Sequence, residues 1–247
     1  MSLKETNIIL STPLVIGAML GLSALSFFGG YLYTKLTGTS NGKSPTQVNV
    51  NQPAAGQQQA AAEPQQDLSK IPGISKDDYV RGNRNADVVL IEYSDYECPY
   101  CKKFHPTMQQ ISKDYGDKIA WVYRHIPLDF HTKAQKSAEA AECAGDIGGD
   151  EGFWKMSDLI FDKMPAMTLD QLPSMAKQIG LNEGKFKSCL DSGKYKDKIA
   201  QQSNIANSAG IQGTPGTVII GKNGKGDFIG GAYPIDQIKE KIDAMLK

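Results

Sequence analysis

Two cysteines separated by two residues, Cys98 and Cys101, have the types and spacing that best fit chemistry in this sequence. Such a pair closes a small disulfide ring only where the backbone turns sharply, as in the first turn of a helix. Pro99 suits the first helical position, because its missing N–H would have no partner inside the helix. The unpaired N–H groups and the dipole there would stabilise a Cys98 thiolate, the reactive form of the residue. With Tyr100 as the other intervening residue, the pair lacks an ionisable imidazole.

A zinc half-site, an inert structural disulfide and a chance occurrence are the alternative interpretations of this pair. Zinc is disfavoured because the remaining cysteines, Cys143 and Cys189, are far apart and form no second Cys-x-x-Cys. Inert disulfides rarely occur where a strand leads into a helix, which is the context expected here. The sequence therefore predicts a redox-active pair whose chemistry uses neither a metal nor a cofactor.

The elements that must position the pair are a strand before it and a helix after it. Residues 88–93 (VVLIEY) have the composition of a short buried strand, and residues 98–115 have helical character. A second strand is expected over residues 118–125. A helical block covering about residues 130–209 follows, with helices at 133–147, 152–163, 169–179 and 183–208.

The C-terminal part of the sequence predicts a hairpin and a last helix. Strands are expected at 217–220 and 226–230, joined by the turn signal Asn223-Gly224, and an amphipathic helix at 235–245. The complete order predicts an α/β domain over residues 71–247 with a helical insertion, folded as one unit. Such a length can bury a substantial core without metals or many disulfides.

Pro215 lies in a Gly-Thr-Pro-Gly turn directly before the strand at 217–220. A proline in such a place is a candidate for a cis peptide bond after Thr214. A loop with trans proline is the ordinary alternative, and the residues by themselves favour it.

Taken together, these motifs resemble the DsbA-like proteins of the thioredoxin superfamily, particularly membrane-anchored bacterial and archaeal members. The resemblance covers about residues 71–247. It depends on the combination of four segments: 94–101 (SDYECPYC), 123–128 (YRHIPL), 140–144 and 213–215.

The resemblance implies a thioredoxin fold and a thiol–disulfide oxidoreductase. It implies that Cys98 is the attacking thiol and Cys101 the resolving one. It also implies that Pro215 is cis and packs beside the pair, with the backbone of Thr214 pairing with substrate peptide. The best-known member has a histidine between its cysteines, so Tyr100 leaves the oxidising strength open.

The expected activity is that of a dithiol oxidase, which introduces disulfides into exported proteins through a mixed disulfide. Its expected partners are reduced or misoxidised exported proteins and a quinone-linked membrane protein that re-oxidises the pair. A disulfide reductase or isomerase of the same fold is one alternative. A non-catalytic chaperone that binds extended peptides is another.

Cys143 and Cys189 both lie on core-facing stripes of predicted helices. Two separate buried thiols are one interpretation. In an oxidising compartment we favour a structural disulfide between them, because closing a loop of that size stabilises a protein by about 4 kcal/mol. A second catalytic pair is disfavoured, since neither cysteine begins a predicted helix.

Several ionisable residues near the pair have two interpretations. His105, one helical turn after Cys101, could tune the pair or serve packing, and packing is favoured. Asp95 and Glu97 could oppose thiolate formation or relay a proton, but solvated loop acids are favoured.

The first 36 residues predict a membrane anchor. The run 7–34 holds no charged residue, and a bilayer core needs about 20 apolar residues in a helix. A cleaved signal peptide is the main alternative, but its apolar region is shorter and the small residues after Phe28 make a poor cleavage site. We therefore expect a single-pass protein of the cell membrane, with contact to lipid at 7–34 and an extracytoplasmic catalytic domain.

Residues 37–70 are rich in Gln, Ala and Pro, which predicts a flexible linker. Across the whole chain, 27 basic residues balance 27 acidic ones, so the formal net charge is zero. Because no local cluster of Lys and Arg occurs either, binding to nucleic acid is not expected.

Overall fold

The computed structural model describes residues 66–247 of the chain. The predicted anchor and nearly all of the predicted linker lie outside these residues. No helix in the described part is both long and apolar enough to cross a bilayer. The last linker residues lie on the domain: Asp67 N–H donates to the Ala209 carbonyl oxygen at 3.0 Å, and Leu68 packs on the apolar core.

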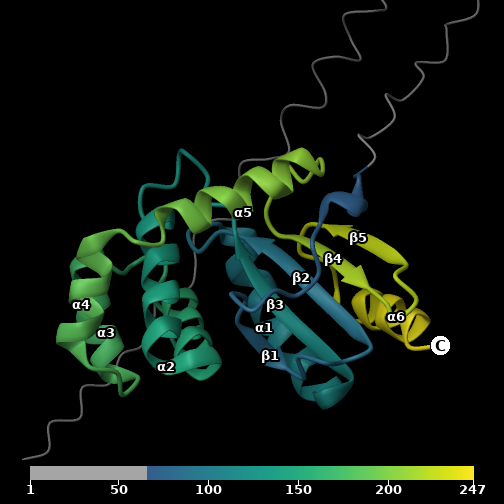
Figure 1. Cartoon of the computed structure of the whole chain (residues 1–247), viewed down its shortest axis with the longest axis horizontal. Coiled ribbons are helices and arrows are strands. Elements are labelled where there is room, and N and C mark those ends of the chain that lie inside the picture. Colours follow the sequence, from purple (N-terminus) through teal and green to yellow (C-terminus); the bar gives the residue numbers. More distant parts are fainter. Residues whose placement is uncertain (1–65) are drawn as a thin grey trace, which may run out of the picture. The chain divides into compact units, whose positions relative to one another are not determined.

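A five-stranded mixed sheet forms the centre of the domain, in the order β1-β3-β2-β4-β5 (Figure 1). The strands are β1 (Val80–Gly82), β2 (Val88–Ser94), β3 (Ile119–His125), β4 (Gly216–Ile220) and β5 (Gly226–Gly230). The central strand β2 pairs parallel with β3 and antiparallel with β4. Both β2 and β3 are almost continuously apolar, because helices cover the sheet on its two faces.

Six α-helices and three short 3-10 turns complete the described domain. The helices are α1 (Pro99–Tyr115), α2 (Ala134–Lys163), α3 (Leu172–Gln178), α4 (Glu183–Ser192), α5 (Lys196–Ser208) and α6 (Ile235–Met245). The turns are η1 (Leu68–Lys70), η2 (Gly116–Lys118) and η3 (Leu169–Gln171). Helices α2 to α5 all fall between β3 and β4, as expected for an α/β domain with a helical insertion.

Different elements pack against the two faces of the sheet. One face packs against α1, α2 and α6 and contains the larger apolar cluster, in which Trp121 and Tyr123 contact Phe153 and Trp154 of α2. The opposite face carries Tyr93 and packs against α5 and the segment that precedes β1. Helices α2, α3 and α4 lie side by side beyond one edge of the sheet (Figure 1). Alternate residues of β2, including Val88 and Leu90, face α1, the helix that begins at the cysteine pair.

The helices of the insertion differ from the prediction in how they are divided. The predicted helix at 183–208 is two helices, because Gly193 adopts the left-handed conformation with φ 64° and ends α4. The division predicted between helices at 133–147 and 152–163 is confirmed, because α2 is broken at Gly149, where the backbone is not helical and φ is 62°. Strand β1 was not predicted, since three residues are too few to show an alternating pattern.

Candidate active site

The cysteine pair lies at the start of α1, where the sequence placed it. Cys98 is the N-cap residue in an extended conformation, and Pro99 occupies the beginning of the helix. The Cys98 N–H donates to the Asp95 carbonyl oxygen at 3.2 Å, which closes the short loop between β2 and α1. The Cys98 sulfur is therefore at the end of the helix that carries unpaired N–H groups.

The two thiols are free and differ in their surroundings. Cys98 is 4% exposed, while Cys101 is completely buried. Tyr100 between them is 66% exposed, so its side chain lies at the surface. An attacking group from solvent therefore cannot reach the Cys101 sulfur without a rearrangement of the site.

The segment around Pro215 meets the pair although it is more than a hundred residues away in the sequence. The Cys98 sulfur lies 3.5 Å from the Thr214 carbonyl oxygen. The peptide bond between Thr214 and Pro215 is cis. Cys98, Thr214 and Pro215, which the sequence singled out separately, are thus brought together.

The electrostatic surroundings give the two cysteines very different pKa values. The pKa of Cys98 is lowered to about 5, with the hydrogen bond from Cys101 as the largest cause. Burial opposes the shift, while Thr214 and the main-chain N–H groups of Tyr100 and Cys101 add to it. Burial raises the pKa of Cys101 well above its ordinary value, and the neighbouring Cys98 raises it further. At neutral pH the site holds one thiolate, on Cys98, and one thiol, on Cys101.

A carboxyl group lies on the face of the sheet below the pair, and the sequence interpretation missed it. Glu92 on β2 is completely buried, and its Oε2 accepts a hydrogen bond from Trp121 Nε1 at 3.0 Å. Burial raises the pKa of Glu92 to about 7, while the nearby Ser94 hydroxyl and the hydrogen bond from Trp121 oppose this shift. A group with such a pKa can give or take a proton near neutral pH. The feature of the sequence that could have indicated Glu92 is that it is the single acidic residue in the apolar run VVLIEY.

The acids next to the pair are not solvated, contrary to expectation. The side chain of Asp95 is fully buried, and it accepts hydrogen bonds from Glu97 N (2.7 Å), Leu128 N (2.8 Å) and His131 Nδ1 (2.8 Å). Glu97 Oε2 accepts from Lys133 N at 2.6 Å. The two carboxylates join the loop before α1 to the loop after β3, because they satisfy main-chain donors that would otherwise lack partners.

His105 points away from the pair into a separate ion-pair cluster. Its Nε2 lies 2.7 Å from Asp158 Oδ1, and Asp158 also pairs with Arg81 at 2.7 Å. The ring packs on Trp121 with centroids 5.4 Å apart. Burial lowers the pKa of His105, although Asp158 opposes that shift. The contacts agree with the favoured packing role.

Two hollows flank the Thr214–Pro215 segment. One, of about 420 Å³, is lined by Tyr100, Lys103, Thr214 and Tyr233. The other, of about 330 Å³, lies behind Pro215. A larger hollow of about 680 Å³ is bounded by the segment before β1 and by α5, and neither active-site cysteine lines it.

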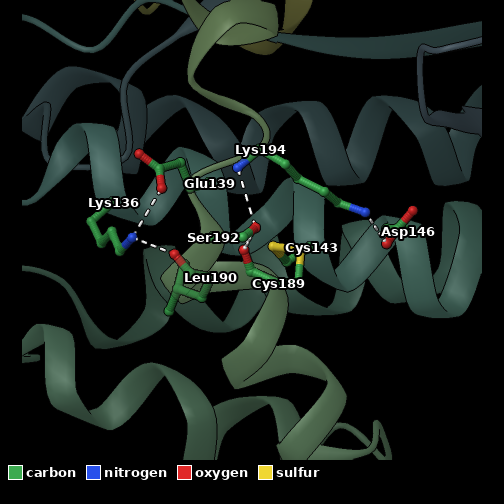
Figure 2. The surroundings of a disulfide bond; sticks show 8 residues. All are labelled: Lys136, Glu139, Cys143, Asp146, Cys189, Leu190, Ser192 and Lys194. Carbon is green, nitrogen blue, oxygen red and sulfur yellow. Dashed lines mark hydrogen bonds and ion pairs between the residues drawn. A yellow bond between two sulfur atoms is a disulfide. The ribbon is translucent and has the colours of Figure 1, made fainter.

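Cys143 and Cys189 form a disulfide that joins α2 to α4, with their Cα atoms 5.8 Å apart (Figure 2). Near it, the Lys136 ammonium donates to the Leu190 carbonyl oxygen at 2.5 Å and forms a second link between the two helices. The disulfide is separate from the active-site pair. In residues 66–247 no group of three or more potential ligands among His, Cys, Asp and Glu is arranged to hold a metal ion.

The family model described as thioredoxin matches residues 75–244 of the chain. Among curated proteins, the chain is 35% identical over 159 residues to a Na(+)/H(+) antiporter NhaA 3 of Salinispora tropica. That match covers 64% of the chain but only 24% of the relative, so the chain spans about a quarter of the length of the curated relatives it matches.

Solved structures cover the domain more completely. DsbA2 of Pseudomonas aeruginosa is 29% identical with a TM-score of 0.60, over 70% of this chain and 96% of that one. Oxidised BdbD of Bacillus subtilis is 25% identical with a TM-score of 0.60, over 74% of this chain and 96% of that one.

Proposed function

The chain belongs to the thioredoxin family and is a thiol–disulfide oxidoreductase, and on this premise we propose that it is a dithiol oxidase for exported proteins. The proposal assigns the attacking role to Cys98 and the resolving role to Cys101. It assigns the binding of substrate backbone to Thr214 and Pro215, with Pro99 and Tyr100 shaping the active-site loop. The DsbA-type structural neighbours support an extracytoplasmic setting.

The proposed cycle has two exchange steps. A substrate thiolate attacks the Cys98 sulfur of the oxidised pair, the Cys98–Cys101 bond breaks, and Cys101 leaves with the electron pair. A second thiolate of the substrate then attacks the substrate sulfur of the mixed disulfide and expels the Cys98 thiolate. The substrate is now oxidised and the pair is reduced. Re-oxidation would come from a quinone-linked membrane protein.

The observation that carries the oxidase assignment is the lowered pKa of Cys98, to about 5. A thiolate that is stabilised at neutral pH stabilises the reduced form of the pair. Because the reduced form is favoured, the disulfide form is a stronger oxidant and a better acceptor for substrate thiols. The buried Cys101 would retain its proton in the same reduced state.

The remaining part of the proposal concerns location. We assign residues 1–36 to a membrane anchor with lipid contact at 7–34, residues 37–70 to a linker, and residues 71–247 to the catalytic domain. The Cys143–Cys189 disulfide supports a setting outside the cytoplasm, since stable disulfides form mainly in oxidising compartments. Labelling of residues 66–247 from outside intact cells would test this assignment.

The reduction potential, measured by equilibrium with glutathione, tests the direction of the reaction. We expect a value nearer to about −120 mV than to about −270 mV, the values of a strong oxidant and of thioredoxin. A value close to that of thioredoxin would instead establish the reductase alternative. Activity that survives Cys98→Ala in cells would favour a non-catalytic chaperone over both enzymatic roles.

A further inference from the structure

A histidine in the loop between β3 and α2 is bonded to the loop that carries Cys98. His131 Nδ1 donates to Asp95 Oδ2 at 2.8 Å, and the same oxygen accepts the Leu128 N–H at 2.8 Å. Asp95 directly follows β2 and lies three residues before Cys98. The imidazole therefore reaches the active-site loop from a position 36 residues further along the chain.

Asp95 connects this histidine to the backbone of Cys98. Its main-chain carbonyl oxygen accepts the Cys98 N–H at 3.2 Å, and its Oδ1 accepts the Glu97 N–H at 2.7 Å. Glu97 Oε2 accepts the Lys133 N–H at 2.6 Å, which is a second bond between the same two loops. One residue thus forms the turn that leads into α1 and receives the bond from His131.

The surroundings of the imidazole keep it in this position. The side chain of Asp95 is 0% exposed and that of His131 is 15% exposed. The ring of Phe130, which is 75% exposed, packs edge-on against His131 with centroids 4.5 Å apart. A buried carboxylate destabilises a fold unless its oxygens accept hydrogen bonds. Without the imidazole, Asp95 Oδ2 would keep only the Leu128 N–H among the described residues.

The bond does not depend on the charge of the imidazole. A carboxylate only accepts hydrogen bonds, so His131 Nδ1 carries a hydrogen in both charge states. The other ring nitrogen, Nε2, is the one that gains or loses a proton. The bond to Asp95 therefore persists when His131 is neutral, and an asparagine, whose amide nitrogen can lie near the place of Nδ1, can reproduce it.

The reactivity of Cys98 depends on where its sulfur lies. The N–H groups at the start of α1 stabilise its thiolate, and attack on its disulfide requires an aligned approach to the sulfur. We propose that His131 is a positioning residue of the redox pair, which acts through Asp95 to hold the loop that places Cys98 at the start of α1. This inference rests on the role proposed for Cys98. A displaced loop would move the sulfur away from these N–H groups and from the Thr214 carbonyl oxygen, 3.5 Å from it.

Another histidine of the chain provides a matched comparison. His105 Nε2 lies 2.7 Å from Asp158 Oδ1, so its bond to a carboxylate is about as short as that of His131. Asp158 pairs in addition with Arg81, at 2.7 Å. In the described part of the chain, Asp158 has no bond to the loop before Cys98. A variant of His105 therefore removes the same kind of bond without releasing that loop.

Two measurements on the full-length chain test the proposal. Absorbance at 240 nm gives the midpoint of the Cys98 thiolate in the reduced protein. Quenched alkylation gives the rate at which reduced glutathione reduces the oxidised protein at pH 7. For His131→Ala we expect the midpoint to rise from about 5 by about one pH unit. The rate should fall about tenfold, because small misplacements of reacting groups slow reactions strongly.

Three further variants separate positioning from a general loss of stability. His131→Asn keeps an N–H donor near the place of Nδ1 and should restore the midpoint and the rate. His131→Gln carries its amide further out, near the place of Nε2, and should behave as His131→Ala. This pair of amide variants keeps the test valid if His131→Ala does not fold. His105→Ala should lose stability in urea while it keeps the wild-type midpoint of Cys98 and the wild-type rate.

The positioning role would be overturned if His131→Ala kept the wild-type midpoint and rate, or if His131→Asn and His131→Gln behaved alike. It would also be overturned if His105→Ala changed both quantities equally. These outcomes are distinct from failure of the proposed function, because glutathione reduces the pair whichever way the protein works in the cell. A reduction potential like that of thioredoxin would refute the oxidase assignment and leave the comparison of these variants valid.

Discussion

Lys102, the residue after Cys101, donates through its ammonium group to the main-chain carbonyl oxygen of Met164, the C-cap residue of α2. The same ammonium donates to the Asp162 carbonyl oxygen at 3.0 Å. The last carbonyl groups of a helix lack partners within the helix and carry a partial negative charge. A cation there satisfies them and fixes the first turn of α1, with both cysteines, to the C-terminal end of α2.

The first prediction follows from this contact. Lys102→Met keeps the apolar stem but removes the ammonium group, so we expect the free energy of unfolding to fall by about 1–2 kcal/mol. Urea unfolding of the oxidised protein measures the change. Lys103→Met is the matched control, since Lys103 is exposed and should change stability by less than about 0.5 kcal/mol. Equal losses in both variants would show that the contact contributes nothing specific.

The second prediction concerns the charge of Glu92. Its pKa is raised from 4.5 to about 7 in the folded protein, so the folded state binds more protons than the unfolded state between these values. The contribution of Glu92 to stability is therefore fully present below about pH 4.5 and is lost as pH rises through 7. Glu92→Gln, which cannot ionise, should be more stable than wild type by roughly 3 kcal/mol at pH 8, with little difference at pH 4.

Unfolding of the oxidised protein across this pH range measures the effect, because the disulfide removes the active-site thiols from the titration. Asp95→Asn serves as the comparison. It changes another fully buried carboxylate, but one that accepts three hydrogen bonds, so it should destabilise the protein. A Glu92→Gln protein whose stability parallels wild type at all pH values would show that Glu92 is not held with a raised pKa.

The parts of the site that are local in sequence could be predicted. The strand before Cys98, the proline after it and the position of the pair at a helix N-terminus all follow from neighbouring residues. The roles of Glu92, Asp95 and His131 could not, because they depend on the sheet register and on loops about 36 residues apart that meet only in the fold. From the sequence alone, an acid in a polar loop is predicted to be solvated, because the distant main-chain donors that bind it are not known.

The helical insertion shows the same limit in its boundaries. Its extent and its place between β3 and β4 follow from apolar periodicity. The break at Gly149 falls between two predicted helices, whereas the break at Gly193, which also has a positive φ angle, interrupts a pattern that otherwise continues. The sequence holds many glycines, and only tertiary packing selects those that adopt this conformation.

The third prediction concerns the Cys143–Cys189 disulfide. It links two cysteines that are 46 residues apart in the sequence. In the chain-entropy model, loss of such a bond lowers the free energy of unfolding by about 4 kcal/mol. The double variant Cys143→Ala/Cys189→Ala should lose about that much stability in urea, and it should keep the exchange rate of the Cys98–Cys101 pair. Alkylation of unreduced protein under denaturing conditions provides the check, since two reactive thiols in Cys98→Ala/Cys101→Ala would show that this bond does not form.

The fourth prediction is the pH dependence of the reduced pair. Iodoacetamide should modify Cys98 with a midpoint near pH 5, and absorbance at 240 nm should rise with the same midpoint. The reactivity of Cys101 should stay low up to pH 9, because its pKa is raised by burial. A midpoint near 9, the ordinary value of a cysteine thiol, would show that the helix N-terminus and Cys101 do not stabilise the thiolate.

The same shift makes the stability of the reduced protein depend on pH. The pKa of Cys98 is lower in the folded state than its ordinary value of 9.0, so between about pH 5 and 9 the unfolded state binds more protons. The stabilisation is complete above pH 9 and is lost as pH falls through 5. The oxidised protein lacks this titration and serves as the control. The unfolding free energy of the reduced form should therefore rise relative to that of the oxidised form from pH 5 to pH 8. The unfolding free energies of Cys98→Ala and Cys98→Ala/Cys101→Ala should differ by a constant amount over this range, because neither variant has the Cys98 titration.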